Sequence, residues 1–326
     1  MAQITFNEEQ NRCINEIHKF MSIKKPYSKL LINGSAGTGK TTILISSVID
    51  FINLHIMSDY DNIKTAIRNN QLETITSLLH FKICAPTNKA KDVLLHKYNA
   101  FINSMKDDAI TDRLVLGHVL HHNINFQTVS QILSINRVIN EMGIEEFTKG
   151  NERKITEKYN NPAYNNTIII IDECSMLDSN ITKLLNVIRC PIIYIGDICQ
   201  LPPVNELLSQ IFQLQDDMNA VCIRLSKVER CKNKITEVAN VLRDKIYGVI
   251  PDFNILVDKK KHSVDEIVMY KKKEDEWIDT YIQDIITKLK QPDKASTTIL
   301  DSMALAWTNN CCSSLNKKIR RKIFQI

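Results

Sequence analysis

Short apolar runs without polar alternation recur along the chain and predict buried β-strands. They cover residues 29–33, 81–85, 167–171 and 191–195, and each is followed by a glycine, a proline or an acidic residue. Continuous runs of this kind are typical of parallel strands that are buried on both faces. Strand, turn and helix patterns alternate along the chain, so the sequence predicts an α/β fold with a mainly parallel, doubly wound sheet.

The same pattern predicts the helices and insertions between the strands. Residues 7–24 form the first predicted helix, with Asn7 as its N-cap and Ile14, Ile17 and Met21 on one apolar stripe. A second helix covers residues 42–56, and residues 57–79 are predicted as a mainly helical insertion. Residues 135–165 are polar and predict a small surface excursion, whereas residues 274–290 predict an amphipathic helix that packs into a core.

A glycine-rich loop lies between the first strand and the helix that follows it. Residues 34–41 read Gly-Ser-Ala-Gly-Thr-Gly-Lys-Thr, and a strand before and a helix after this pattern are the context of a phosphate-binding loop. The glycines allow a tight turn with inward-facing N–H groups, and the helix N-terminus adds partial positive charge. Lys40 is predicted to reach the β- and γ-phosphates, and the Thr41 hydroxyl to hold Mg²⁺. The predicted nucleotide-binding residues of this loop are Gly34, Ser35, Ala36, Gly37, Thr38, Gly39, Lys40, Thr41 and Thr42.

Acidic residues follow two of the other strand runs. Asp172 and Glu173 stand at the carboxyl end of residues 167–171, where carboxylates are costly unless something occupies them. With the loop nearby, Asp172 is predicted to bind the Mg²⁺ shell and Glu173 to orient and deprotonate the attacking water; two exposed acids at a strand end are the alternative. The apolar run 191–195 is followed by Gly196 and Asp197. Gln200, three residues later, is placed to sense the γ-phosphate with its amide. Taken alone, this segment also fits a simple turn.

Two further groups of residues have two interpretations each. Gln10, in the first turn of the first helix, could read an adenine edge with its carboxamide or be a solvated glutamine. Thr87, Asn88 and Lys89 stand at a predicted helix N-terminus on the carboxyl edge of the sheet. They could hold nucleic-acid phosphates there, or Thr87 could simply cap the helix.

Composition narrows the class of protein but not its activity. The chain has 326 residues, enough for about two domains, with 44% hydrophobic and 24% charged residues. These values are typical of an ordinary soluble protein, and the sequence has neither a secretory signal nor a long enough apolar window to predict a membrane partner. We therefore expect an intracellular location, without distinguishing the cytoplasm from a nuclear or viral replication site. The net charge of +5 permits a nucleic-acid partner without requiring one.

Taken in order, four segments resemble motifs I, Ia, II and III of superfamily 1 helicases. They are residues 34–41, 85–90, 171–177 and 196–204. The similarity is closest to the RecD/Dda type, whose members share Ser-Met-Leu after the acidic pair and Gln-Leu-Pro-Pro-Val in motif III. The resemblance places Gln10 in the adenine-reading Q motif. It also places Thr128 in motif Ib, which implies a nucleic-acid contact, although Ser130 replaces the histidine common there.

The resemblance implies two lobes. It predicts a RecA-like ATP-binding lobe over residues 1–215 and an incomplete second RecA-like lobe over residues 216–326. Residues 221–230 resemble motif IV, whose arginine, here Arg230, acts in the family as a finger on the γ-phosphate. We find no counterpart of motifs V and VI in the sequence, so a fragment, a natural truncation and one part of a split gene product all stay open.

The function implied by the resemblance is the ATPase part of a DNA helicase or translocase. Such a protein couples Mg²⁺-dependent ATP hydrolysis to movement along single-stranded or forked DNA, from 5′ to 3′ in this group, with replication or repair proteins as partners. The sequence does not exclude RNA as the strand that is bound. Residues 135–165 occupy the place of the family's duplex-splitting wedge. The alternative is a module that binds ATP and a strand or a protein with little turnover; a small-molecule kinase is disfavoured by the Asp-Glu pair.

Overall fold

The computed structural model describes residues 5–75, 77–105, 112–139, 145–148, 150–217, 220–229, 243, 278–279, 281–283 and 309–324. The chain divides into two compact units, Met1–Lys232 and Asn233–Ile326. Most of the described residues belong to the first unit, which contains all of the predicted phosphate-loop and acidic residues. The two units are therefore described separately.

The first unit is built on a six-stranded sheet in which every pair of neighbours is parallel. The strand order is β3-β2-β6-β7-β1-β8. The strands are β1 (Lys29–Gly34), β2 (His80–Ala85), β3 (Ile124–Thr128), β6 (Thr167–Ile171), β7 (Ile192–Gly196) and β8 (Ala220–Leu225). The four predicted strands are all present, and β6 and β7 are buried at every position, as continuous apolar runs predict. The predicted α/β fold and RecA-like lobe are confirmed.

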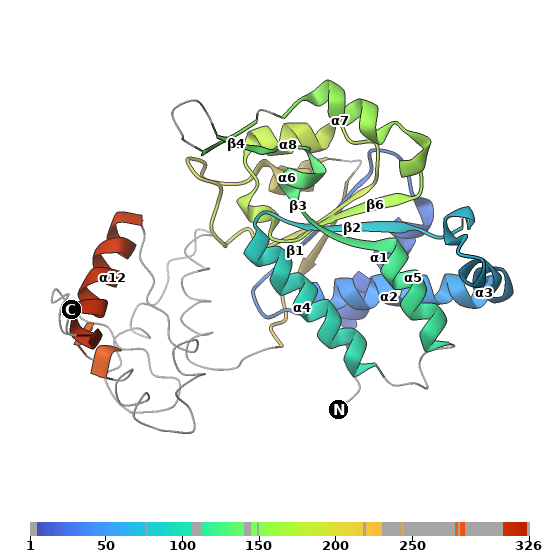
Figure 1. The fold of residues 1–326 in the computed structure, drawn as a ribbon, viewed down its shortest axis with the longest axis horizontal. Helices are drawn as coiled ribbons and strands as arrows, with labels where there is room; N and C mark the ends of the chain where they lie inside the picture. The colour runs from blue at the N-terminus through green and yellow to red at the C-terminus, as the bar shows by residue number, and fades with distance from the viewer. Residues whose placement is uncertain are drawn as a thin grey trace. The chain divides into compact units, whose positions relative to one another are not determined.

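Helices cover both faces of this sheet (Figure 1). One layer contains α1 (Glu8–Ile23), α2 (Lys40–Ser58), α3 (Tyr60–Arg68), α4 (Asn88–Ser104) and α5 (Arg113–Asn123). The other contains α6 (Val129–Ile132), α7 (Glu152–Tyr159) and α8 (Ser179–Asn186). Short 3-10 turns lie at Leu72–Thr74, Pro162–Tyr164, Cys174–Met176 and Gln210–Asp216.

The two layers form two separate cores because alternate strand residues point to opposite faces. Ile168 and Ile170 of β6 belong to the core under α2, whereas Ile169 and Ile171 belong to the core under α7 and α8. By length and hydropathy α2 could cross a membrane, but 56% of that apolar window is buried inside the lobe. Its apolar character is therefore accounted for by the core.

Residues 135–165 contain a structure that the sequence did not predict. Within them, β4 (Arg137–Ile139) and β5 (Glu145–Phe147) pair antiparallel, with Val138 opposite Glu146. Asn136 and Thr148 extend this pairing, because the Asn136 N–H donates to Thr148 Oγ1 and the Thr148 N–H donates to the Asn136 carbonyl, both over 2.8 Å. The surface excursion thus includes a two-stranded antiparallel ribbon followed by α7.

The boundary between the lobes also differs from the expectation. We placed it at residues 215/216, but β8 pairs with β1 along its whole length, from Ala220 opposite Lys29 to Leu225 opposite Gly34. Leu225 is buried in the core of the first unit, which extends to Lys232. Residues 220–225 therefore complete the first sheet, and the assignment of the remaining chain to a second RecA-like lobe stays a prediction.

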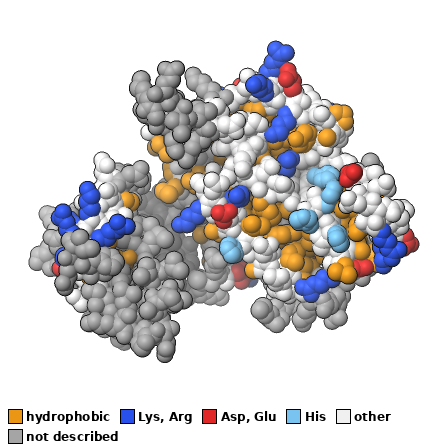
Figure 2. All heavy atoms as spheres, in the orientation of Figure 1, with side chains coloured by type: hydrophobic (Ala, Val, Ile, Leu, Met, Phe, Trp, Pro, Cys, Tyr) orange, Lys and Arg blue, Asp and Glu red, His pale blue; other side chains and the backbone are white. Residues whose placement is uncertain are grey.

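In the second unit the structure describes one long helix and a few residues of the predicted helix 274–290. Ile278 and Ile282 lie in this predicted helix and are both buried, as its core assignment requires. The long helix is α12 (Asn309–Phe324), on which Lys and Arg side chains gather (Figure 2). These basic residues are solvent-exposed.

Candidate nucleotide-binding site

The phosphate loop connects β1 to α2 and depends on its glycines. Gly37 and Gly39 have φ values of 85° and 83°, which side chains other than glycine rarely adopt. Gly34 is required for a different reason, since a Cβ there would lie 2.9 Å from the carbonyl oxygen of Leu225. The loop can therefore turn under the start of α2 while staying packed against β8.

The side chains of the loop bond to its own backbone. The Lys40 ammonium donates to the carbonyl oxygens of Gly34 and Ser35 over 2.5 and 2.8 Å, and Thr38 Oγ1 donates to the Ser35 carbonyl over 2.9 Å. Thr38 is buried, whereas Lys40, Thr41 and other loop residues line an open cleft. These bonds hold the ammonium group at the mouth of the loop, where a phosphate could replace the carbonyl oxygens.

The two predicted acids meet the loop at the end of β6. Thr41 Oγ1 donates to Asp172 Oδ2 over 3.1 Å, and the N–H of Glu173 donates to Asp172 Oδ1 over 2.9 Å. Glu173 itself has a φ of 55°, a left-handed conformation that turns the chain sharply after the strand. Thus a hydroxyl and a carboxylate from separate elements lie together, and both are oxygen donors of the kind that Mg²⁺ prefers.

Burial dominates the electrostatics of this acidic pair. It raises the pKa of Asp172, and the hydrogen bonds from Glu173 and Thr41 oppose this only in part. Burial also raises the pKa of Glu173, the neighbouring Asp172 raises it further, and the charges of Lys40 and Lys97 work against both. Two carboxylates that are costly to ionise together are well suited to a bound cation.

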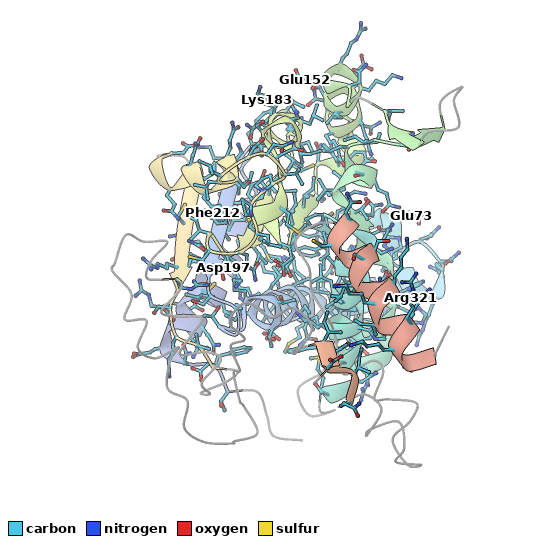
Figure 3. All side chains as sticks on the ribbon, turned by 90° about the vertical axis from the view of Figure 1, so that its left-hand side faces the viewer. Glu73, Glu152, Lys183, Asp197, Phe212 and Arg321 are labelled. Atoms are coloured by element: carbon cyan, nitrogen blue, oxygen red, sulfur yellow. The ribbon has the colours of Figure 1, made fainter. Side chains whose placement is uncertain are left out.

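Asp197 has a structural role that the sequence did not reveal. It follows β7 (Figure 3), which lies between β1 and β6 in the sheet. Its side chain is buried, with only 1% exposed. Its carboxylate accepts hydrogen bonds from the N–H of Ala36 over 3.2 Å and from that of Cys199 over 3.0 Å. Asp197 therefore ties the phosphate loop to the segment that contains Gln200. The Gly-Asp step after a buried strand was the available signal, but it does not show which backbone the acid bonds.

These elements enclose a cleft of about 720 Å³, within the usual size range of small-molecule sites. Among the predicted residues, those lining it are Gln10, Ala36, Gly37, Gly39, Lys40, Thr41, Thr42, Asp172, Glu173 and Gln200. Gly34, Ser35 and Thr38 belong to the loop but do not line the cleft. Lys97, Lys227 and Glu229 also line it and were not predicted. The structure thus brings the phosphate loop, both acids and Gln200 to one cavity.

Gln10 lies in this cleft but is not a solvated residue. It is 6% exposed; its side-chain Nε2 donates to the Thr38 carbonyl over 3.1 Å, and its Oε1 accepts the N–H of Asn7 over 2.9 Å. In turn, Asn7 Oδ1 accepts the N–H of Gln10, which completes a capping box. Gln10 therefore braces the phosphate loop against α1, and its predicted contact with adenine stays a prediction.

The segment after β8 is fastened to both α1 and the loop. The carboxylate of Glu9 accepts the N–H groups of Ser226 and Lys227, each over 3.0 Å, and the N–H of Glu229 donates to the Gly37 carbonyl over 2.9 Å. The Glu229 carboxylate accepts from Asn7 Nδ2 over 2.6 Å. Residues 226–229 thus form one wall of the cleft. The predicted finger Arg230 lies outside the described residues.

Replacing Glu9 with Gln should loosen this wall, and we expect protection of the Ser226 and Lys227 amides from hydrogen exchange to fall about tenfold. Partial burial raises the pKa of Glu9, but the bonds from Lys227 and Ser226 outweigh it and leave the pKa below its usual value. The Glu9 carboxylate therefore contributes its full stabilisation at pH values above its pKa in the unfolded chain. This stabilisation is lost as the pH falls through the lower pKa that Glu9 has in the folded chain.

Glu8→Gln is the matched control, because Glu8 lies in the same helical turn and is exposed. Protection in this variant should match that of the parent chain. Equal loss of protection in both variants would mean that Glu9 has no specific role in holding residues 226–229.

The predicted nucleic-acid contacts lie at two different depths. Thr87, Asn88 and Lys89 are exposed at the start of α4, where Thr87 Oγ1 caps the helix by accepting the N–H of Ala90 over 3.2 Å. Thr128 is only 7% exposed, and its hydroxyl caps α6 by accepting the N–H of Gln131 over 3.2 Å. Capping therefore occurs at both sites. Contact with a nucleic-acid strand stays a prediction at both sites. The start of α4 is the better placed for such a contact because it is exposed.

A parallel sheet with a glycine loop after β1 and paired acids after β6 defines a P-loop nucleotide-binding domain. A family model described as an AAA domain, AAA_19, matches residues 20–206, more than half of the chain. The chain belongs to this AAA domain family of P-loop NTPases.

Two individual proteins are also similar to the chain. An uncharacterized protein, R530, of Acanthamoeba polyphaga mimivirus is 26% identical over 245 residues, which cover 73% of this chain and 42% of that protein. The chain therefore spans less than half the length of this curated relative. The crystal structure of Pif1 helicase from Candida albicans aligns with a TM-score of 0.40 and 18% identity, over 87% of this chain and 55% of that one.

Proposed function

We propose that the chain is the ATPase part of a DNA helicase or translocase, which couples ATP hydrolysis to movement along single-stranded DNA. The observation that carries the proposal is the meeting of Thr41, Asp172 and Glu173 beside Lys40 in one cleft. This set contains a phosphate-binding ammonium, two oxygen donors for a cation and a candidate base. Phosphoryl transfer to water needs these groups in one place.

Each group has a distinct part in the proposed reaction. Lys40 leaves the loop carbonyls and binds the β- and γ-phosphates, which take over as acceptors of its hydrogen bonds. Thr41 and Asp172 would hold Mg²⁺, which supplies charge neutralisation to the phosphates when bound. Glu173 accepts the proton of the attacking water, and Gln200 senses the γ-phosphate from the segment that Asp197 anchors.

The nucleic-acid part of the proposal depends on the order of the helicase-like motifs in the sequence. The exposed Thr87, Asn88 and Lys89 would contact phosphates of the strand at the start of α4. The ribbon of β4 and β5 stands in the place of the family's wedge, and its antiparallel pairing supports that role. The 5′ to 3′ direction is carried over from the resemblance alone.

ATP hydrolysis measured with and without single-stranded DNA tests this function. We expect DNA to stimulate turnover severalfold, and Lys40→Ala to lower both the basal and the stimulated rate by at least about 100-fold because the phosphates lose their main cation. Lys183→Ala, on α8 and remote from the cleft, is the control and should keep the parent rate.

Two results would contradict the proposal. Tight ATP binding without turnover, with or without DNA, would favour a binding module. Turnover that DNA and RNA both leave unchanged would identify an ATPase that is not a nucleic-acid motor.

A further inference from the structure

Lys97 is a basic residue of the nucleotide cleft that neither the phosphate-loop pattern nor the acidic pair accounts for. It lies in α4, the helix that follows β2 and packs beside α2. Its side chain lines the same cleft as Lys40, Asp172 and Glu173, yet Lys97 is solvent-exposed. Lys97 therefore lines the cleft from α4, whereas Lys40 lines it from the start of α2.

Among the described residues, three lysines line the cleft, and they differ in what they bind. Lys40 donates to two carbonyl oxygens of the loop, and the Lys227 ammonium lies 3.2 Å from the carboxylate of Glu229. Within the described part of the chain, the side chain of Lys97 has no hydrogen bond or ion pair. Its ammonium group can therefore bind a ligand without giving up a hydrogen bond or an ion pair within the described residues.

Lys97 comes from the side of the sheet that carries the acidic pair, because α4 follows β2, and β2 is the neighbour of β6, after which Asp172 and Glu173 stand. Burial raises the pKa of Asp172 and of Glu173, and among the groups that oppose this are Lys97 and Lys40. Gln10, at the predicted adenine end, lies instead on α1, which contacts α2 and β8. Lys97 therefore lines the cleft on the side of the acidic pair, where the cation and the attacking water are proposed to lie.

We propose that Lys97 is a second phosphate-binding cation, which contacts the terminal phosphate of a bound nucleoside triphosphate from the side of α4. The inference rests on the proposed nucleotide function and extends it. A triphosphate brings several negative charges next to two carboxylates. An exposed ammonium such as that of Lys97 compensates these charges most strongly when it lies close to them. A diphosphate lacks the group that Lys97 would contact, so Lys97 should favour triphosphate over diphosphate.

Equilibrium binding of Mg²⁺ with either ADP or the non-hydrolysable triphosphate AMP-PNP tests the proposal. In Lys97→Met, which keeps the length of the stem and removes the charge, we expect affinity for AMP-PNP to fall about tenfold and affinity for ADP to stay within about twofold. Lys97→Arg should recover most of the lost affinity, because it restores a cation. Lys91→Met, on the same helix and outside the cleft, is the matched control and should bind both nucleotides like the parent chain.

The outcomes separate this proposal from the one it rests on. If the parent chain binds neither nucleotide, the proposed function itself fails. If the parent chain binds AMP-PNP and Lys97→Met binds it equally well, or loses ADP and AMP-PNP to the same extent, only the role of Lys97 is overturned. Unchanged thermal unfolding of Lys97→Met would show that a selective loss of AMP-PNP binding does not come from a damaged fold.

Discussion

Replacing Glu173 with Gln is expected to slow ATP hydrolysis by about 100- to 10,000-fold while ATP affinity changes by only a few fold. Glutamine keeps the size and hydrogen-bonding ability of the side chain but cannot accept a proton from water. Glu173 lines the cleft directly after Asp172, and its left-handed backbone conformation with φ of 55° places it at a sharp turn beside the loop. The measurement is steady-state turnover together with equilibrium ATP binding.

Glu152→Gln is the control for this experiment, because Glu152 is an exposed acid on α7 that lies well apart from Asp197 (Figure 3). Turnover of this variant should match that of the parent chain. Glu173 would lose its role as the base if its own variant retained more than about a third of the parent turnover, since loss of a general base costs far more than that.

Replacing Gly34 with Ala should weaken nucleotide binding by about tenfold or more and lower the free energy of unfolding by about 1–3 kcal/mol, the usual range for overpacking. The new Cβ would lie 2.9 Å from both the Cβ and the carbonyl oxygen of Leu225, and 3.0 Å from Thr38 Oγ1. Relieving these close contacts requires β8 or the phosphate loop to move. We expect the loop to move, because β8 is held by its hydrogen bonds to β1. Urea unfolding and ATP titration measure the two effects.

Gly117→Ala is the matched control for this substitution. Gly117 lies inside α5, and a Cβ there would meet no atom within 4 Å. Alanine has the better helix propensity, so this variant should gain about 0.5–1 kcal/mol and bind ATP normally. A Gly34→Ala chain that bound ATP as tightly as Gly117→Ala would show that the contact between the loop and β8 is not needed for the site.

The buried centre of the fold was predictable because its sequence signals are local and strong. The runs that form β1, β2, β6 and β7 are continuous and apolar, and a strand buried on both faces requires this pattern. The first helix was predictable from Asn7, which accepts the N–H of Gln10 as a cap. Its predicted range, 7–24, agrees with Glu8–Ile23 within one residue at each end.

The edges of the sheet were harder to predict because their signals are weaker. β3 has polar residues at alternate positions, Asn125 and Gln127, and pairs only with β2 within the sheet. β8 is only partly buried, and its membership of the first sheet depends on pairing with β1, nearly 200 residues earlier in the chain. The ribbon of β4 and β5 has strands of three residues, too short for a period of two to be recognised.

The chemistry of the site divides in the same way. The sequence was enough to identify the phosphate loop, residues 34–41, and the acidic pair Asp172-Glu173. Each of these features consists of consecutive residues, so a local sequence pattern reveals it. Only the tertiary structure decided that Asp197 binds the N–H of Ala36, that Gln10 binds the carbonyl of Thr38 and that Lys97 lines the cleft. Each of these side chains contacts or approaches a segment that is distant in sequence. Which distant segments become neighbours depends on the order of the strands in the sheet, and a local sequence pattern does not contain that information.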